Sequence, residues 1–401
     1  MEEYKIALET LLCISTQGSK PGLSRIKKVL KIFKNPQKKL KAILISGTNG
    51  KGSTTYFVSK ILVDRGYRVG TFISPPIFSI RERIQLNLKY ISKKEFAKYF
   101  FKVNKVVKKS KIPLTFFEYL TTMAILYFYE KKVDFAVMEI GMGGRLDATN
   151  ICDPIISIIC SIGYDHTRHL GESYREIAYE KCGIFRKGRI AIIPSVIKAR
   201  RWIEKYARKK GSKLMVVKVK KFRTIFPDFQ NSNIACAVGA AKVLGIKHSE
   251  AIGSINNFQL KARWEKISAK PKIIIDCAHN PPAIDAVLPS LKKDFPSNKK
   301  NILVYASMKD KDYKKVLKKL LPFFSIVVFT KAYLKRSEEP NNLVETAKKI
   351  FKSKKYFVED DPKKAFRLAK KLASLDGNIL IIGSIYLLQA IFAKEKFFVS
   401  G

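Results

Sequence analysis

The stretch KAILISGTNGKGS at residues 41–53 decides how this chain folds. Residues 42–45 form a short apolar run, as in a buried strand of a parallel sheet, and an amphipathic segment follows the glycines to about residue 65. A glycine-rich turn between a strand and a helix lets backbone N–H groups surround phosphate oxygens, with the positive end of the helix dipole behind them. The stretch therefore predicts a phosphate-binding loop in an α/β domain.

The loop supplies a compact set of candidate nucleotide-binding residues. They are Gly47, Thr48, Asn49, Gly50, Lys51, Gly52 and Ser53. Lys51 is expected to reach the outer phosphates, and Ser53 is placed to hold Mg²⁺. The spacing departs from the usual phosphate loop, because only two residues separate the first glycine from Gly50 and Lys51. A tight strand–helix turn that binds nothing is the alternative.

The rest of the chain repeats the alternation of apolar strands and helices. Strands are expected at 41–46, 68–73, 133–140, 155–162, 272–275, 302–305, 326–330, 356–358 and 379–382, and helices at 118–130 and 229–244. The pattern restarts near residues 260–263. Such alternation indicates two α/β domains with mainly parallel sheets, residues 1–259 and 260–401. Ligands bind such sheets at the carboxyl ends of the strands, so the residues just past each strand matter most.

The composition excludes several classes of protein. Hydrophobic residues make up 46% of the 401 residues, which excludes wholesale disorder. Six scattered cysteines without a CxxC pair indicate neither a zinc ribbon nor a disulfide framework. No apolar run approaches the ~20 residues of a membrane span, and the acidic N-terminus lacks a signal-peptide pattern. We therefore expect a cytoplasmic protein without a membrane partner.

The charge is extreme, with 78 Lys and Arg against 33 Asp and Glu, a formal net charge of +45. Such a balance invites a nucleic-acid interpretation, because basic residues displace counterions from a phosphate backbone. The lysines nevertheless occur in short runs along the whole chain, without a basic tail or a recognised nucleic-acid motif. We expect no nucleic-acid partner and attribute the charge to overall composition. A positive field that attracts anionic substrates is the alternative.

Polar residues follow several of the expected strands. Glu139 ends an apolar strand, where a carboxylate is unfavourable unless it meets a cation or N–H groups, and a Mg²⁺ ligand fits this place. Arg145, in the segment EIGMGGRLDATN, is suited to gripping a carboxylate or phosphate, or to an ion pair with Asp147. His166 lies beyond the next strand. Alone it indicates a structural histidine, and in this context a metal ligand.

Two further segments contain candidate residues. Because the chain is so rich in lysine, composition alone predicts that Lys181 of YEKCGIF is an exposed surface charge. Asp276 and His279 end the first strand of the second domain, in DCAHNPP, and Arg263 precedes them. Asn280 before Pro281 also has the pattern of a helix N-cap.

Together these motifs resemble the folylpolyglutamate synthase/dihydrofolate synthase family of the Mur ligase superfamily. The resemblance covers about residues 1–395. The markers occur in family order: PGLSRI, GTNGKGS, ISPPIFSIRERI, TFFEYLTTMA, EIGMGGRLDATN, DHTRHLG, YEKCGIF, the helix start at 230–233, ARWE, DCAHNPPA and GSIYL. It implies an ATP- and pterin-binding Mur ligase domain over 1–259 and a Rossmann-like glutamate ligase domain over 260–401.

The resemblance also implies roles for individual residues. The metal ligands for two Mg²⁺ ions would be Ser53, Ser74, Glu139, His166 and Lys181, the last as a CO₂-derived carbamate. Asn233, Arg263 and Asp276 match ATP-contacting positions. Phe117, Glu118, Arg145 and Leu146 fall on the substrate side, and the catalytic set is Lys51, Glu139, His166, Lys181 and His279.

The implied reaction joins L-glutamate to dihydropteroate or folate through an acyl phosphate, with ATP as the phosphoryl donor. We expect a monomer. A Mur-like ligase for a different acid is the main alternative, and a non-catalytic nucleic-acid-binding protein is the other. Three departures stand out: Pro76 replaces a family histidine, Ala262 a glycine, and Pro282 a second histidine.

Overall fold

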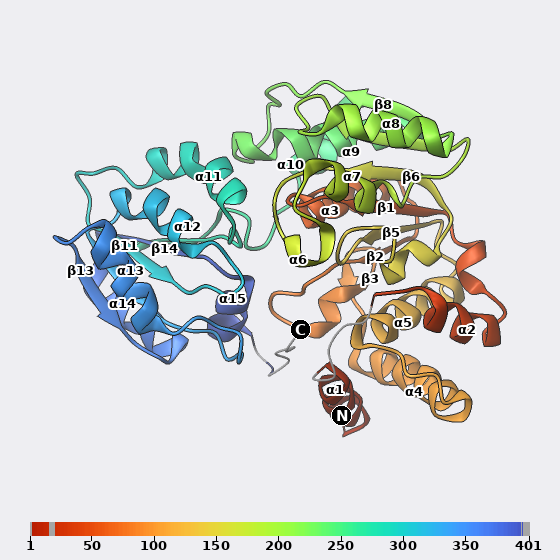
Figure 1. Ribbon diagram of the computed structural model, residues 1–401, viewed down its shortest axis with the longest axis horizontal. Coiled ribbons are helices and arrows are strands. Elements are labelled where there is room, and N and C mark those ends of the chain that lie inside the picture. The colour runs from red at the N-terminus through yellow and green to blue at the C-terminus, as the bar shows by residue number, and fades with distance from the viewer. Residues whose placement is uncertain (1, 16–20, 394, 396–401) are drawn as a thin grey trace. The chain divides into compact units, whose positions relative to one another are not determined.

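The computed structural model describes residues 2–15, 21–393 and 395 (Figure 1). It consists of two compact units. Unit 1 contains the described residues up to Pro76 and those from Ile80 to Gln259. Unit 2 contains Ile77–Ser79 and the described residues from Leu260 onward.

Unit 1 is built on an eight-stranded sheet, counted over the described residues, in the order β4-β3-β2-β5-β1-β6-β7-β8. Six of these strands run parallel, namely β2, β5, β1, β6, β7 and β8, and β3 and β4 extend the sheet as antiparallel strands. The strands are β1 Ala42–Ser46, β2 Val69–Phe72, β3 Ile84–Leu86, β4 Lys89–Tyr90, β5 Phe135–Glu139, β6 Pro154–Ile159, β7 Ile190–Pro194 and β8 Lys213–Val217.

The register places three strand ends at one edge of this sheet. Ile45 of β1 pairs with Glu139 of β5, and Ser46 pairs with Ile159 of β6. The carboxyl ends of β1, β5 and β6 are therefore level, and this is the edge at which parallel α/β sheets bind their ligands.

Helices cover both faces of the sheet. Neighbouring residues of a strand point to opposite faces, and in β2 Gly70 lies under Phe128 of α5 (Phe116–Glu130) whereas Thr71 donates a hydrogen bond to Ser59 of α3 (Lys51–Asp64). Figure 1 shows α1, α4 and α5 grouped together, away from α3, α9 and α10. The remaining helical segments are α1 Glu2–Ser15, α2 Ser24–Ile32, η1 Pro36–Lys39, η2 Ile80–Arg83, α4 Lys93–Ser110, η3 Ala148–Ile151, α6 Thr167–Leu170, α7 Tyr174–Cys182, α8 Arg200–Lys210, η4 Asp228–Gln230, α9 Asn231–Val243 and α10 His248–Asn256.

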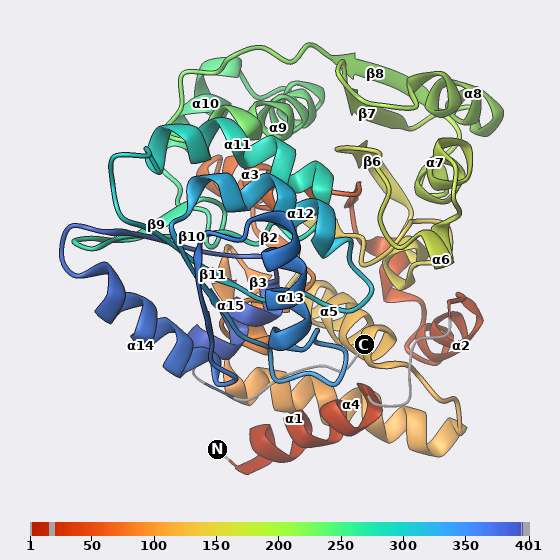
Figure 2. The same cartoon turned by 60° about the vertical axis from the view of Figure 1, so that its left-hand side comes forward.

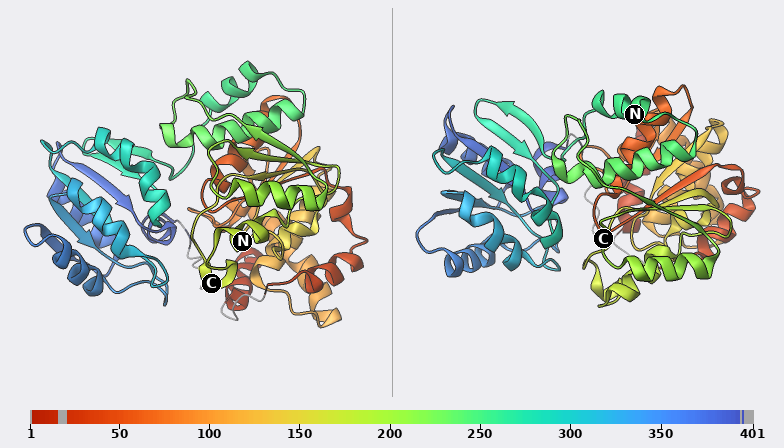
Figure 3. Two further views of the ribbon diagram at one scale, coloured as in Figure 1. Left: turned by 45° about the horizontal axis from the view of Figure 1, so that its top comes forward. Right: turned by 90° about the horizontal axis from the view of Figure 1, so that it is seen from above.

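Unit 2 is a second α/β layer structure, with the strand order β13-β12-β11-β14-β10-β9 among the described residues. Only the edge strand β9 of these is antiparallel to its neighbour. Helices α14 and α15 pack on one face of the sheet, and α11, α12 and α13 form a row on the other (Figures 2 and 3). The elements are β9 Glu265–Ala269, β10 Lys272–Ile275, α11 Pro281–Asp294, β11 Asn301–Tyr305, α12 Tyr313–Leu320, η5 Leu321–Phe323, β12 Ile326–Phe329, α13 Pro340–Ile350, β13 Lys355–Val358, α14 Pro362–Ala373, β14 Asn378–Ile382 and α15 Ile385–Phe392.

The expected fold class is confirmed, since both sheets are mainly parallel and carry helices on their faces. Strands β3, β4, β7, β8 and β9 were not predicted. Asn280 caps α11 as its pattern indicated, because its side chain accepts the Ala283 N–H at 2.9 Å. The six cysteines are all free thiols. No helix in the described ranges is long and apolar enough to cross a membrane.

One short segment belongs to a unit that the chain order does not suggest. Ile77, although it follows the Ser74–Pro75–Pro76 turn of unit 1, is buried in the hydrophobic cluster of unit 2 together with Ile275 and Leu388. This placement could not be predicted from the sequence, because an apolar segment can be buried in either unit.

Candidate active site

The glycine-rich loop is held in place by the residues that follow β6. The Thr48 N–H donates to the Ser161 carbonyl at 3.0 Å, and the Asn49 N–H donates to Ser161 Oγ at 2.9 Å. Thr48 Oγ1 donates to the Gly163 carbonyl at 3.0 Å. These bonds fix the loop before any ligand arrives. Ser161 was not predicted, because the expected strand at 155–162 included it, whereas β6 ends at Ile159.

Gly50 has a conformation and a neighbour that exclude a side chain. Its φ of +85° is in the left-handed region, and a Cβ there would lie 2.1 Å from Asn233 Oδ1. The Asn233 amide in turn donates to Gln230 Oε1 at 2.7 Å. The structure thus brings the predicted Asn233 against the loop and adds Gln230, which is buried, as its support.

Lys51 begins α3, and its ammonium folds back onto its own loop. Nζ donates to the carbonyls of Gly47 at 3.1 Å and Thr48 at 3.3 Å. Ser53 lies two residues further and is buried, and Gly52 between them is also buried. The lysine is therefore at the mouth of the loop, where the outer phosphates of a bound nucleotide are expected.

Glu139 and Ser74 meet at the ends of β5 and β2. Glu139 is buried, and its Oε2 accepts the Ser74 N–H at 2.9 Å. Arg83 donates to Ser74 Oγ at 3.1 Å and lies 5.4 Å from the ring centroid of Phe116. The sequence brought Ser74 and Glu139 forward as separate candidates. It did not single out Arg83, which is buried and had only its place in ISPPIFSIRERI as a signal.

Lys181 lies on α7 and is 2% exposed. Burial, and then the positive charge of Lys51 nearby, lower the pKa of Lys181 to about 7. Among the described residues no hydrogen bond or ion pair reaches its ammonium. Lys181 is therefore not the surface charge that composition alone indicates. An ammonium in such a place is unfavourable.

His166 is exposed, has a φ of +51° and precedes α6. Its N–H donates to Asp165 Oδ1 at 2.9 Å, and the Asp165 charge acts on Lys181. Within the described ranges no three His, Cys, Asp or Glu side chains are grouped to hold a metal. The predicted ligand set contains only two residues of these types, Glu139 and His166, so the remaining donors would be hydroxyls, phosphates and a modified lysine.

The segment 141–147 forms a wall beside Phe117. A Cβ at Gly141 would lie 2.7 Å from the Phe117 ring and 3.1 Å from Asp147 Oδ2. The buried Asp147 accepts N–H groups from Met142 at 2.9 Å and Thr149 at 3.0 Å, while burial raises the pKa of its carboxyl group. Leu146, half-buried, adjoins Asp147 in this wall. Sequence reasoning did not assign Asp147 to the substrate side.

Two predicted substrate residues have protein partners. The expected alternative of an Arg145–Asp147 ion pair is wrong, because the guanidinium binds Glu180 through Nε at 3.0 Å and Nη2 at 2.8 Å. Glu118 Oε2 accepts from Arg25 Nε at 3.0 Å and closes a capping box with Thr115. Glu118 Oε1 is buried and has no hydrogen-bond partner among the described residues.

In unit 2 the structure brings Arg263, Asp276 and His279 together. Asp276 follows β10 and is buried, and the charges of Arg263 and His279 act on its carboxylate. Burial is the larger effect and raises the pKa of Asp276. Its oxygens accept the N–H groups of Ala278 and Trp264, each at 2.7 Å.

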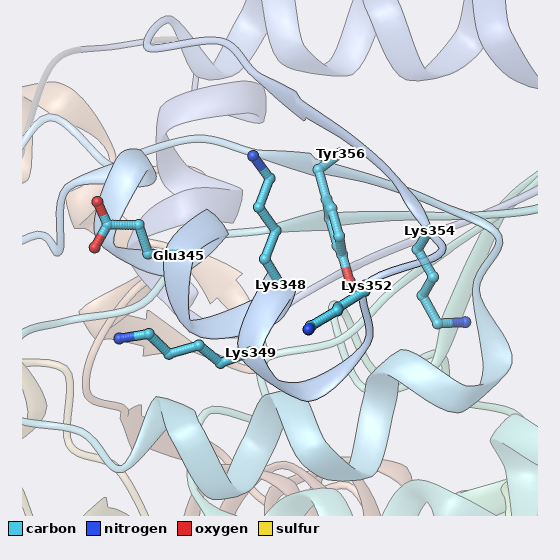
Figure 4. A pocket seen from close by; sticks show the side chains of 6 residues that line it. All are labelled: Glu345, Lys348, Lys349, Lys352, Lys354 and Tyr356. Atoms are coloured by element: carbon cyan, nitrogen blue, oxygen red, sulfur yellow. The ribbon is translucent and has the colours of Figure 1, made fainter.

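A cavity of about 680 Å³ lies elsewhere in unit 2, between α13 and β13 (Figure 4). It is lined by Glu345, Lys348, Lys349, Lys352, Lys354 and Tyr356. The ammonium groups of Lys348, Lys349 and Lys354 point in different directions in Figure 4. No predicted site residue lines this cavity, and its lysines do not converge on one point.

Comparison with known proteins identifies the family. Residues 45–250 match the Mur ligase middle domain, and residues 262–385 match the Mur ligase glutamate ligase domain. The chain is 30% identical to the dihydrofolate synthase/folylpolyglutamate synthase of Bacillus subtilis, over 94% of this chain and 96% of that one.

Solved structures agree with this assignment. Escherichia coli FolC in complex with DHPP and ADP superposes with a TM-score of 0.87 at 26% identity, over 96% of both chains. The folylpolyglutamate synthase of Thermotoga maritima superposes with a TM-score of 0.81 at 32% identity, over 97% of this chain and 96% of that one. The chain belongs to the dihydrofolate synthase/folylpolyglutamate synthase family of ATP-dependent Mur ligases.

Proposed function

We propose that this chain uses ATP to join L-glutamate to dihydropteroate, and that the same site also extends folates with further glutamates. The observation that supports this most is that the charges of Lys51, Glu139 and Lys181 all act on Cys160, the residue just past the end of β6. A wall of apolar and carboxyl groups at Phe117, Gly141 and Asp147 lies in the same unit. The related FolC structure with DHPP and ADP supports a pterin acid and a nucleotide as ligands.

The reaction proceeds in two steps. The carboxylate of the acid attacks the γ-phosphoryl group of ATP, which gives an acyl phosphate and ADP. The amine of L-glutamate then attacks the acyl carbon, and inorganic phosphate leaves. Lys51 at the loop mouth offsets the negative charge that would otherwise repel the incoming carboxylate, and the loop N–H groups orient the phosphates.

The residues present fit divalent cations. The buried Glu139 carboxylate and the Ser74 hydroxyl beside it are hard oxygen donors, which Mg²⁺ prefers. We propose that Ser53, Ser74, Glu139, His166 and a carbamate on Lys181 hold two Mg²⁺ ions. Bound there, the ions neutralise phosphate charge. A related enzyme solved with Mn and AMPPNP supports metal use together with a nucleotide.

The surroundings of Lys181 support a carbamate on its side chain. The amine must be neutral to add to CO₂, and burial with a pKa of about 7 provides a neutral fraction at physiological pH. The product is an anion, which the neighbouring positive charge of Lys51 stabilises instead of opposing.

The wall beside Phe117 is proposed to hold the pterin. Gly141→Ala places a methyl group 2.7 Å from the Phe117 ring and 3.1 Å from Asp147 Oδ2, so one of them must move. We expect the KM for the pterin acid to rise about tenfold or more while the KM for ATP changes little, because misplacement of about an ångström is enough for such a loss. Steady-state kinetics with each substrate varied in turn measures both values. Equal changes in both KM values would contradict this role.

The choice of acid is tested by measuring phosphate release with dihydropteroate and tetrahydrofolate side by side, each with and without L-glutamate. We expect glutamate-dependent turnover of both, because they share the pterin and p-aminobenzoyl groups and differ by one glutamyl length. Robust turnover of tetrahydrofolate without detectable turnover of dihydropteroate would overturn the choice of acid. Turnover of neither would contradict the proposed function.

A further inference from the structure

The loop that carries Arg263 has an unusual backbone. Ala262 has a φ of +49° and Trp264 a φ of +55°, so two residues with side chains adopt the left-handed conformation on either side of Arg263. Residues other than glycine disfavour the left-handed conformation, because their Cβ approaches the following carbonyl oxygen. Such a conformation persists only where the surroundings enforce it.

Two buried carboxylates enforce it. Asp276 Oδ2 accepts the Trp264 N–H at 2.7 Å, and Glu265 Oε2 accepts the Ala262 N–H at 2.7 Å. Each left-handed residue thus has its own carboxylate. The Cys277 N–H adds a bond to the Ala262 carbonyl at 3.2 Å, which ties the loop to the end of β10.

Glu265 is placed for this task and for little else. It is the first residue of the edge strand β9, and it is 7% exposed while the next two residues of the strand are exposed. Its second oxygen, Oε1, accepts from Lys261 Nζ at 3.0 Å. Both carboxylate oxygens therefore bind the loop, at residues 261 and 262.

The side chain of Trp264 anchors the other end of the loop. Its Nε1 donates to Asp294 Oδ2 at 2.8 Å, and its ring lies 6.3 Å from that of Phe295, edge to face. Ala262 is fully buried in the hydrophobic cluster of the unit. Arg263, half-buried, is thus held by fixed neighbours on both sides.

We infer that Glu265 is a positioning residue for Arg263: by binding the Ala262 N–H, it holds the left-handed turn that aims the guanidinium. The inference rests on the proposed nucleotide contact of Arg263. A guanidinium contacts phosphate in a defined plane, so a change in its backbone anchor weakens the contact although its charge remains.

Three variants of the intact chain test the inference through kcat/KM for ATP. Glu265→Ala removes the acceptor, and we expect a loss of about tenfold. Glu265→Gln keeps an oxygen for the Ala262 N–H and should restore activity to within about threefold of wild type. Lys261→Ala is the matched control, because it removes the ion pair to Glu265 and leaves the Ala262 bond in place. It should behave as wild type.

The second arm is a double-mutant cycle with Arg263→Ala. If Glu265 acts through Arg263, Glu265→Ala lowers activity in the wild-type background and adds less than about twofold in the Arg263→Ala background. Equal losses in the two backgrounds overturn the inference, as does full activity of Glu265→Ala. Should Glu265→Ala fail to fold, Glu265→Gln decides, and a loss as large as that of Arg263→Ala overturns the inference. Full activity of Arg263→Ala would instead remove the proposed nucleotide contact on which the inference rests.

Discussion

Lys51→Ala should abolish ligation while the fold stays intact. The ammonium lies at the mouth of the glycine-rich loop and, within the described part of the chain, donates only to the carbonyls of Gly47 and Thr48, so its removal leaves the supporting bonds to Ser161 in place. Loss of one preorganised charge at a reacting phosphate typically lowers the rate ~10²-fold or more. The measurement is glutamate-dependent phosphate release, with thermal unfolding as the test of fold.

Lys60→Ala is the matched control, because Lys60 lies on the same helix and pairs with Asp64 at its far end. It should retain activity. Glu139→Gln should resemble Lys51→Ala, because it keeps the size of the side chain and an acceptor for the Ser74 N–H but removes the charge that a cation requires. A Glu139→Gln enzyme with near-normal turnover would contradict the metal assignment.

Lys181→Ala should also lose most activity, about 10²-fold by the same electrostatic reasoning. The proposed carbamate supplies oxygen ligands that alanine cannot provide. Acetate in the assay should restore part of the activity by placing carboxylate oxygens in the vacated space. Lys205→Ala on α8 is the control, because Lys205 is exposed and its ammonium lies over the Trp202 ring, 5.7 Å from the ring centroid.

The carbamate itself is open to direct observation. Native mass analysis in bicarbonate buffer should show an added CO₂ that is absent from Lys181→Ala and present in Lys205→Ala. Electron density showing a free amine beside an occupied second metal position would refute the modification. Activity of Lys181→Ala equal to wild type would refute its catalytic importance.

Much of the fold could be predicted from the sequence, because the signals for its strands are local. The run at 42–45 is apolar because β1 is covered on both faces. For the same reason the expected strands that correspond to β10, β11, β12 and β14 fall within one residue of their observed bounds. The edge strands β4, β8 and β9 were missed because their residues are largely half-buried or exposed, so they lack a continuous apolar run.

The candidate site could be predicted from the sequence only in part. Glu139 could be singled out because it ends an apolar strand, whereas Ser74 was proposed only through the family resemblance. The hydrogen bond between Ser74 and Glu139, and the contact of Arg83 with Ser74, depend on how the turn after β2 folds back. No spacing in the sequence predicts the course of this turn.

The sequence by itself determined the α/β class, the glycine-rich loop and the order of the motifs, because these depend on apolar runs, glycine freedom and near neighbours along the chain. Only the tertiary structure decided which charged side chains form ion pairs. Arg145 binds Glu180, 35 residues away, and not Asp147, because α7 packs against the segment 141–147 that contains Arg145. The tertiary structure also lowers the pKa of Lys181, because burial of this side chain removes the water that would solvate an ammonium.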